Sequence, residues 1–379
     1  MMEMASIGVF IAWISAFGVA SGNEPEGRCN RAALEEDLKT LSENLLQDAD
    51  IPGISFAVGG ARGVIVASGA GVADKQTGRR AEADTIYQIG SITKMFSGTA
   101  FAKLVSEDRV SLSTPLAEAW PESSKAPVSP NGVITLQHVA THTAGLPRYP
   151  SNLERTDGDP ILGFTDEQLT KGLELSILEN APGSVWEYSN FGYGVLSYAV
   201  YQLTGERLEG IVENEIAEPL DLKDTRFELT KEQQSRLATP YRDEDSMIST
   251  VPWRMGAMSA AGGLFSTVED LSQYARWELT GLPSYMKNDE ARYLAQAPLH
   301  RFPNRPSMAY GIGHFIMDDW IEGRDVVWHG GDVDGYAGAL LMLPDEGLSF
   351  AYLLNRGIGQ PLGAYQKSAV QIILKHCAP

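Results

Sequence analysis

The sequence predicts an α+β fold, in which one antiparallel sheet is built from both ends of the chain, flanked by helices, and accompanied by an inserted helical lobe. Two observations lead to this prediction. Apolar strand pairs occur near both ends of the chain, at 54–69 and at 337–355, whereas the middle, about 92–320, carries mainly helical patterns. No internal repeat or long linker interrupts the chain, so we expect one domain over residues 30–379.

The composition supports a globular protein. Of the 379 residues, 43% are hydrophobic and 21% are charged, which allows a large core and argues against extended disorder. The net charge of −19 argues against nucleic acid or an anionic membrane surface as a partner, because both are themselves negatively charged. The charge does not select a substrate.

Residues 1–22 are predicted to be a signal peptide. The stretch from Ala5 to Ala20 is uncharged, and Gly18, Ala20 and Ser21 provide the small residues of a cleavage site. The leading Met-Met-Glu-Met carries no positive charge, so an uncleaved N-terminal membrane anchor is the alternative. We expect a secreted or periplasmic protein with no membrane span after processing.

The strands and terminal helices follow from local patterns. Leucines at positions 34, 38, 41 and 45 predict an amphipathic helix, which Ile51-Pro52-Gly53 ends. ISFAV (54–58) and GVIVASG (63–69) predict a β-hairpin, and AGALLMLP (337–344) with LSFAYLLN (348–355) predicts a second strand pair. A helix at about 361–376 closes the chain.

The helical lobe is predicted from four segments with helical periodicity, at 134–142, 165–180, 191–205 and 267–279. Thr165 and Thr267 are each followed by acidic residues and are predicted N-caps. The glycine-rich stretch 256–267 is flexible enough to form a cleft wall. Tyr310 is expected to be a core aromatic residue rather than part of that cleft.

The two cysteines, Cys29 and Cys377, stand near opposite ends of the mature chain. The termini of a domain often lie close together, so these cysteines can form a disulfide in an oxidising compartment. Two unrelated thiols are an equally open alternative. We expect neither to be catalytic, because no histidine pattern accompanies Cys29 and Cys377 lies at the chain end.

The stretch QIGSITKMFSG places Ser91 three residues before Lys94. On a helix, that spacing puts both side chains on one face, and the helix N-terminus favours a developing negative charge. A serine becomes a nucleophile only when a base takes its proton, which a neighbouring lysine can do. Taken alone, the pattern equally describes a helix cap followed by a surface lysine.

Tyr188-Ser189-Asn190 precedes a predicted helix and adds a second element. A tyrosine beside a lysine ammonium is expected to lose its proton more readily than usual and so to act as a base. Asn190 can orient both the lysine and a substrate carbonyl. A buried core aromatic is the alternative for Tyr188, although it suits Tyr193 and Tyr198 better.

His329-Gly330-Gly331 is the third element and is expected just before an apolar strand. The glycines would let a substrate approach the strand edge, where a backbone N–H would complete an oxyanion hole with the N–H of Ser91. The alternative is a turn that carries a surface histidine.

The sequence contains no complete metal-binding motif. His138 and His142 are four residues apart, but no third ligand and no glutamate of a metalloprotease motif accompanies them. A buried, hydrogen-bonded histidine and a histidine at a helix end are the expected interpretation. A metal site at these two histidines is therefore not expected; the family resemblance described next implies neither a metal nor an organic cofactor.

Together, GSITK, YSN, LQHVATHTAGLP and WHGGDVDGYAG, in that order, resemble the serine β-lactamase-like hydrolases. This group includes class C β-lactamases, penicillin-binding DD-peptidases, and related esterases and D-amino-acid-specific peptidases. The resemblance extends from about residue 32 to the C-terminus. It implies the β-lactamase/transpeptidase-like version of the predicted fold, with a cleft between sheet and helical lobe. It also implies roles for single residues: Ser91 as nucleophile, Lys94 as its proton partner, Tyr188 as base and later acid, Asn190 in substrate positioning, and His329-Gly330-Gly331 at the strand edge.

One departure from the family pattern concerns substrate choice. Class C β-lactamases and DD-peptidases typically carry Lys-Thr-Gly where this chain has His329-Gly330-Gly331. A histidine is mostly uncharged at neutral pH, so the grip on a substrate carboxylate is weakened while the acyl-transfer groups stay intact. We therefore expect a serine hydrolase of a small ester, amide or peptide. The alternatives are a class C-type β-lactamase or DD-carboxypeptidase, and, ranked lower, a non-catalytic ligand-binding member of the fold.

Overall fold

The computed structural model describes residues 29–121, 129, 131–154, 159, 161–242, 248–281, 289–357 and 362–377. The predicted signal peptide, residues 1–22, lies outside these ranges. Within them, no helix is both long enough and apolar enough to cross a bilayer.

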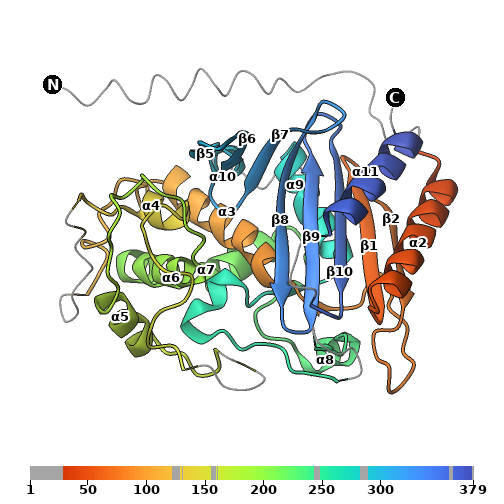
Figure 1. The fold of residues 1–379 in the computed structure, drawn as a ribbon, viewed down its shortest axis with the longest axis horizontal. Coiled ribbons are helices and arrows are strands. Elements are labelled where there is room, and N and C mark those ends of the chain that lie inside the picture. The colour runs from red at the N-terminus through yellow and green to blue at the C-terminus, as the bar shows by residue number, and fades with distance from the viewer. Residues whose placement is uncertain are drawn as a thin grey trace.

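One antiparallel sheet of eight strands dominates one side of the described structure (Figure 1), in the order β2-β1-β10-β9-β8-β7-β6-β5. The N-terminal hairpin and the β9–β10 hairpin meet at β1 and β10, where Ile54 pairs with Leu354 and Val58 with Phe350. This junction confirms that both chain ends build the sheet. The strands are β1 (Gly53–Gly60), β2 (Gly63–Gly71), β5 (His300–Phe302), β6 (Arg305–Tyr310), β7 (Phe315–Ile321), β8 (Arg324–Val333), β9 (Tyr336–Leu343) and β10 (Leu348–Leu354).

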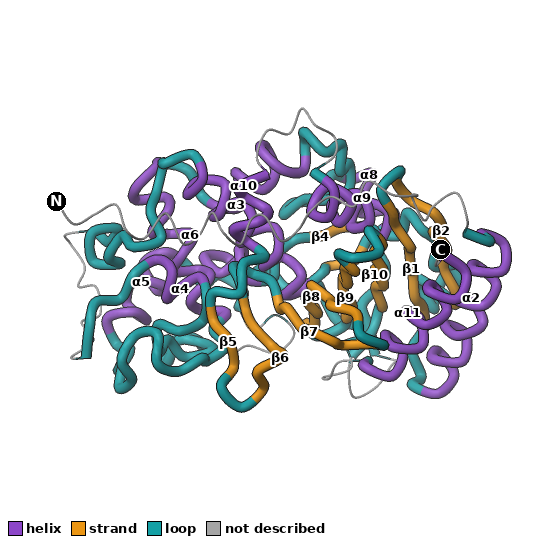
Figure 2. Tube along the Cα trace, turned by 90° about the horizontal axis from the view of Figure 1, so that it is seen from above, coloured by secondary structure: helices purple, strands orange, loops and turns teal. Residues whose placement is uncertain are grey.

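Helices cover both faces of the sheet (Figure 2). The terminal helices α2 (Arg31–Asp48) and α11 (Gly363–Cys377) lie together on one face, over the apolar side chains of β1, β9 and β10. Helix α9 (Val268–Thr280) packs on the opposite face against β1, β2 and β10. Side chains alternate between the two faces along each strand, so both layers bury apolar residues of the same strands.

The helical lobe lies beside the sheet (Figure 1) and shares the larger of the two apolar cores with it. The side chains of Thr165 and Thr267 accept hydrogen bonds from Gln168 N and Asp270 N, as N-caps do. The remaining elements, not all of them in the lobe, are the helices α3 (Thr93–Ser106), α4 (Leu136–Ala140), α5 (Asp166–Glu174), α6 (Asn190–Thr204), α7 (Leu208–Ile211), α8 (Lys231–Arg236) and α10 (Asp289–Ala295), the 3₁₀ turns η2 (Gly90–Ile92) and η4 (Gly256–Ala261), the π-helical segment η3 (Val212–Ala217), and the short strands β3 (Tyr87–Gln88) and β4 (Phe265–Ser266).

The structure differs from the sequence-based expectation in the extent of the helical insert. Strands β5, β6 and β7 occupy 300–321, a region that we expected to lie in or at the end of the helical part. β5 and β6 lie at the outer edge of the sheet and are largely exposed, so they lack the apolar alternation of a half-buried strand. The helix expected over 165–180 ends at Glu174, and that over 134–142 spans only Leu136–Ala140.

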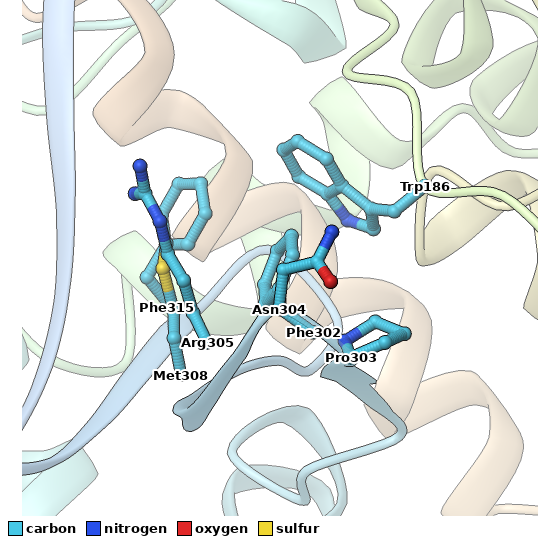
Figure 3. Close-up of a pocket in the computed structure, with 7 residues that line it drawn as sticks. All are labelled: Trp186, Phe302, Pro303, Asn304, Arg305, Met308 and Phe315. Carbon is cyan, nitrogen blue, oxygen red and sulfur yellow. The ribbon is translucent and has the colours of Figure 1, made fainter.

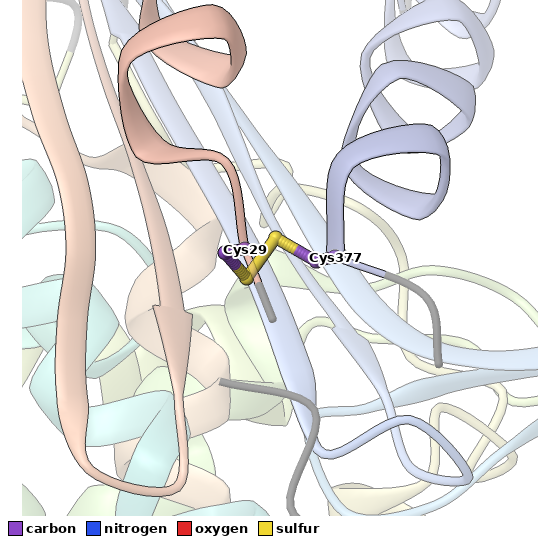
Figure 4. The surroundings of a disulfide bond; sticks show 2 residues. All are labelled: Cys29 and Cys377. Carbon is purple, nitrogen blue, oxygen red and sulfur yellow. A yellow bond between two sulfur atoms is a disulfide. The ribbon is translucent and has the colours of Figure 1, made fainter. Parts of the chain in front are cut away.

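A disulfide joins the two ends of the described chain (Figure 4). Cys29 and Cys377 lie 348 positions apart in sequence, with 4.2 Å between their Cα atoms. Neighbouring contacts hold the same ends together: Asn30 N donates to the carbonyl of His376, and Asp37 accepts from both Lys375 and His376. The pairing of α2 with α11 brings the two cysteines together, which local sequence patterns do not reveal.

Candidate active site

The 3₁₀ turn η2 and the start of α3 position Ser91 and Lys94. Gly90 has φ = +51°, and a β carbon there would lie 2.8 Å from the backbone N of Asp332 in β8, so a glycine suits this tight approach. Ser91 is partly exposed, whereas Lys94, one turn further on, is fully buried. Helix α3, which carries Lys94 and follows the turn of Ser91 directly, is itself almost entirely buried, which fixes the direction of the Lys94 side chain.

The amine of Lys94 has three neighbours. Its Nζ lies 2.7 Å from Asn190 Oδ1 and 2.6 Å from the carbonyl oxygen of Ala261, and both of these atoms can only accept a hydrogen bond. The third neighbour is Ser91 Oγ at 3.2 Å. A neutral amine has two N–H groups for the two carbonyl oxygens and one lone pair. In the structure Nζ donates to Ser91 Oγ; in the neutral form, the lone pair would instead accept the hydroxyl proton of Ser91.

Electrostatics favour this neutral form of Lys94. Burial holds the pKa of its ammonium well below the usual value, and the positive charge of Arg148 lowers that pKa further. A buried lysine with a depressed pKa is a suitable proton acceptor at neutral pH.

Tyr188 contacts the same serine from the other side. Its hydroxyl donates to Ser91 Oγ at 2.7 Å. Burial raises the pKa of Tyr188 above its usual value, although the bond to Ser91 and the charge of Arg148 act in the opposite direction. This direction is opposite to the lowered tyrosine pKa that we expected beside a lysine. Burial penalises both the phenolate and the ammonium, so it favours the phenol form of Tyr188 and the amine form of Lys94.

Asn190 is the first residue of α6 and follows the N-cap Ser189, whose hydroxyl accepts from Gly192 N. Its carbonyl oxygen accepts from Lys94, and its Nδ2 donates to the hydroxyl of Tyr149 at 2.9 Å. The two bonds orient the side chain toward Lys94, so the structure brings Asn190 together with Ser91, Lys94 and Tyr188.

His329-Gly330-Gly331 precedes the apolar strand β9, as we expected, and it lies within a strand of its own, β8, rather than in a turn. The pairing of β8 with β7 ends where Trp328 meets Phe315, whereas residues 329–333 pair with β9 alone. The triad therefore stands where one edge of β8 is open, and η2 lies against it. A β carbon on Gly331 would lie 1.9 Å from the carbonyl oxygen of Ile89, so only glycine allows this contact.

His329 is an uncharged side chain in this structure. Burial, and then the charge of a protonated Lys94, lower the pKa of the imidazole to about 3. Its Nδ1 lies 2.6 Å from the carbonyl oxygen of Gly330, so Nδ1 carries the proton and donates it. The buried Nε2 has no hydrogen-bond partner within the described part of the chain.

The two histidines of the LQHVATH stretch, His138 and His142, each accept a hydrogen bond from a backbone N–H group. His138 closes a capping box at the start of α4, where its Nδ1 accepts from Thr135 N. His142 is buried, accepts from Ser189 N through Nδ1, and packs its ring 4.6 Å from that of Tyr188. In the ranges that the structure describes, no three potential metal-ligating side chains cluster together.

An apolar pocket of about 410 Å³ lies next to these groups (Figure 3). Trp186, two residues before Tyr188, forms one wall, and its ring centroid is 6.1 Å from that of Tyr188. Phe315 forms another wall and lies 5.2 Å from the ring of His329. The pocket thus opens at the fork where β7 leaves β8. Its other lining residues come from the β5–β6 hairpin, namely Phe302, Pro303, Asn304, Arg305 and Met308.

Sequence reasoning missed several residues that contribute to the site. The carbonyl of Ala261 in η4, the hydroxyl of Tyr149 and the guanidinium of Arg148 reach the cluster only through folding. The glycine-rich stretch was expected as a cleft wall, but nothing in it points to a backbone carbonyl as a lysine partner. Tyr310 is buried among the rings of His142, Trp186 and Phe315, as a core aromatic residue would be.

An antiparallel sheet joined to a helical lobe, with serine, lysine and tyrosine meeting at their junction, defines the serine β-lactamase-like class of proteins. The chain belongs to the Beta-lactamase family, whose family model matches residues 38–375. This membership confirms the resemblance that the sequence motifs indicated.

Individual relatives are distant. The chain is 30% identical over 216 residues to the D-alanyl-D-alanine-carboxypeptidase/endopeptidase AmpH of Escherichia coli, covering 56% of this chain and 53% of the relative. It is 25% identical over 323 residues to Protein flp of Staphylococcus aureus, covering 85% of this chain but 63% of that protein's length. The octameric penicillin-binding protein homologue from Pyrococcus abyssi has the same fold, with a TM-score of 0.77 at 24% identity, over 90% of this chain and 77% of that one.

Proposed function

We propose that the protein is a serine hydrolase that cleaves a small ester or amide through an acyl-enzyme on Ser91. One observation carries this proposal: Ser91 Oγ lies within hydrogen-bond distance of both Lys94 Nζ and Tyr188 OH, and burial favours the neutral forms of both. The serine thus has a base and an acid beside it before any substrate binds.

In the proposed first half-reaction, Ser91 Oγ attacks the substrate carbonyl carbon, and its proton passes to the lone pair of Lys94. The bond to the leaving group then breaks, and the leaving group takes the proton of Tyr188. Lys94, which shares the Ser91 oxygen with Tyr188, returns its proton to the phenolate. Water then attacks the acyl carbonyl by the reverse route, which releases the acid and restores the serine.

The open edge of β8 supplies the second part of the proposal. The backbones of Gly90 and Gly331 approach closely, because Gly331 packs against the Ile89 carbonyl and Gly90 against the backbone of Asp332. We propose that the N–H of Ser91 and an N–H of this strand edge hold the oxyanion. Backbone donors positioned in this way are the usual stabilisers of acyl-transfer transition states.

We expect intact-mass spectrometry to show one adduct after treatment with a fluorophosphonate probe. The Ser91 oxygen would bond to phosphorus, fluoride would leave, and Lys94 would take the proton. Ser91→Ala should show no adduct, whereas Ser106→Ala, at the far end of the same helix, should label like the parent protein. An adduct that persists in Ser91→Ala would contradict the proposal.

The pocket and His329 favour an ester or amide with an apolar substituent over a β-lactam or a D-alanyl peptide. His329 lacks the positive charge that would grip a carboxylate at the strand edge, whereas the pocket beside it is lined mainly by apolar side chains.

We expect p-nitrophenyl esters to be hydrolysed with higher kcat/KM than a cephalosporin reporter, and faster than D-alanine is released. From acetate to hexanoate, kcat/KM should rise by up to about fourfold per methylene that enters the pocket. Met308→Trp, which narrows the pocket, should flatten that rise, and Val133→Trp at a 64% exposed position should not. The reverse ranking of substrates would support the β-lactamase or DD-carboxypeptidase alternative.

A further inference from the structure

Arg148 lies in a short loop that is hydrogen-bonded to Ser189 and to the first residues of α6. Ser189 Oγ donates to the carbonyl of Pro147, and the backbone N–H groups of Asn190 and Phe191 donate to the carbonyl of Arg148. Asn190 Nδ2 also donates to the hydroxyl of Tyr149. The backbone of Arg148 is therefore fixed to the same turn that carries Tyr188 and Asn190.

The side chain of Arg148 places a permanent positive charge beside the catalytic cluster. The residue is exposed, and its guanidinium carbon lies 5.3 Å from the ring centroid of Tyr188. The charge reaches the buried groups as well, because it lowers the pKa of Lys94 and acts against the raised pKa of Tyr188. Within the described chain no carboxylate forms an ion pair with Arg148, although the protein carries a net charge of −19.

The charge of Arg148 contrasts with the neutral state of His329. An arginine stays protonated throughout the physiological pH range and offers a planar donor pair that matches a carboxylate. The strand-edge histidine has a pKa of about 3 and offers an unpaired acceptor, which does not attract an anion. The fixed cation of this site therefore lies in the segment between α4 and α5, and not at the β8 edge.

We infer that Arg148 binds an anionic group, a carboxylate, that the substrate carries beside the bond to be cleaved. The inference rests on the proposed function, because it concerns the substrate of the Ser91 site. It narrows the substrate class to esters and amides that carry one negatively charged substituent beside Arg148 in addition to an apolar substituent in the pocket. It does not require that the charge approach the 329–331 triad.

The test compares two acetyl esters that differ in one charge, 4-acetoxybenzoate and its methyl ester. Release of the corresponding phenols gives kcat/KM for each, and the anionic-to-neutral ratio is the readout. We expect Arg148→Gln to lower this ratio roughly five- to tenfold, the effect of one partly exposed charged contact. Arg148→Lys should retain an intermediate ratio, and high ionic strength should reduce the ratio of the parent protein.

Two further variants locate the effect. Arg301→Gln removes an equal charge from an arginine that pairs with Asp318 on the outer strands, and it should leave the ratio unchanged. Arg305→Gln removes the cation at the rim of the apolar pocket. The inference is overturned if the ratio follows Arg305 instead, or if Arg148→Gln lowers kcat/KM for both esters equally.

The pH profile separates a charge effect from a structural one. Without the positive charge of Arg148, the pKa of Lys94 should rise, so the acid limb of the neutral ester should move to higher pH. A variant that is merely loosened would lose activity at all pH values. If no fluorophosphonate adduct forms on Ser91, the proposed function fails; if the adduct forms without a charge preference, only the present inference fails.

Discussion

Lys94→Ala is expected to lower kcat by about 10²–10⁴-fold, the range of a lost proton-transfer group. The structural reason is that the Nζ lone pair is the proton acceptor nearest to Ser91 that burial keeps available. Steady-state hydrolysis of a p-nitrophenyl ester measures the effect.

The same variant should lose the acid limb of the pH–rate profile. The folded-state pKa of Lys94 is lowered, so its amine is free above that pKa and becomes protonated as the pH falls through it. Activity should decline with Lys94 protonation in the parent protein, whereas the residual activity of Lys94→Ala should not show this dependence. His329, with a pKa of about 3, does not titrate in the range of the assay.

Stability should change much less than activity. A base with a lowered folded-state pKa binds fewer protons folded than unfolded, so at neutral pH it opposes folding, and removing it relieves this cost. The loss of hydrogen bonds to Asn190 and Ala261 acts in the other direction. We therefore expect thermal denaturation to show a similar Tm for Lys94→Ala and the parent protein. A large fall in Tm would instead assign Lys94 a structural role.

Tyr188→Phe is the second change with a large expected effect. It removes the hydroxyl that lies 2.7 Å from Ser91 Oγ while it keeps the ring that packs against His142 and Trp186. We expect kcat for an amide to fall by about 10²–10⁴-fold, because an amine leaving group needs a proton. A p-nitrophenyl ester should suffer less, because p-nitrophenolate leaves without one.

Tyr193→Phe is the matched control for Tyr188→Phe. Tyr193 lies in α6, which follows Tyr188, is fully buried, and donates its hydroxyl proton to the carbonyl of Ala140 rather than to Ser91. Its loss should affect Tm more than it affects the ratio of amide to ester hydrolysis. Equal activity of Tyr188→Phe and the parent protein on both substrates would contradict the proposed role of Tyr188 as proton donor.

Local patterns predicted the elements whose signals are carried by neighbouring residues. The leucine repeat of α2, the two hairpins of the sheet and the threonine caps of α5 and α9 appear in the structure because each depends on short-range spacing. The edge strands β5 and β6 escaped prediction because their exposed, polar side chains follow no two-residue alternation. Their place in the sheet follows from pairing with β7, which is a long-range contact.

The candidate site also combines features that local sequence predicts with features that depend on long-range contacts. Ser91 and Lys94 are three residues apart in the turn η2 and the helix α3 that follows it, so their proximity follows from the sequence, and the motif order pointed to Tyr188, Asn190 and the 329–331 triad. The sequence alone indicated this set of candidate groups and the class of protein.

Only the tertiary structure decided how those groups behave. The protonation of Lys94 and Tyr188 depends on burial and on Arg148, which lies between α4 and α5 and is held beside them by backbone hydrogen bonds to the start of α6. The open edge of β8 depends on where β7 turns away, and the pocket on a hairpin far along the chain. Desolvation and charge–charge interactions act through space. Residues distant in sequence therefore determine the protonation of the side chains that the sequence motifs identify.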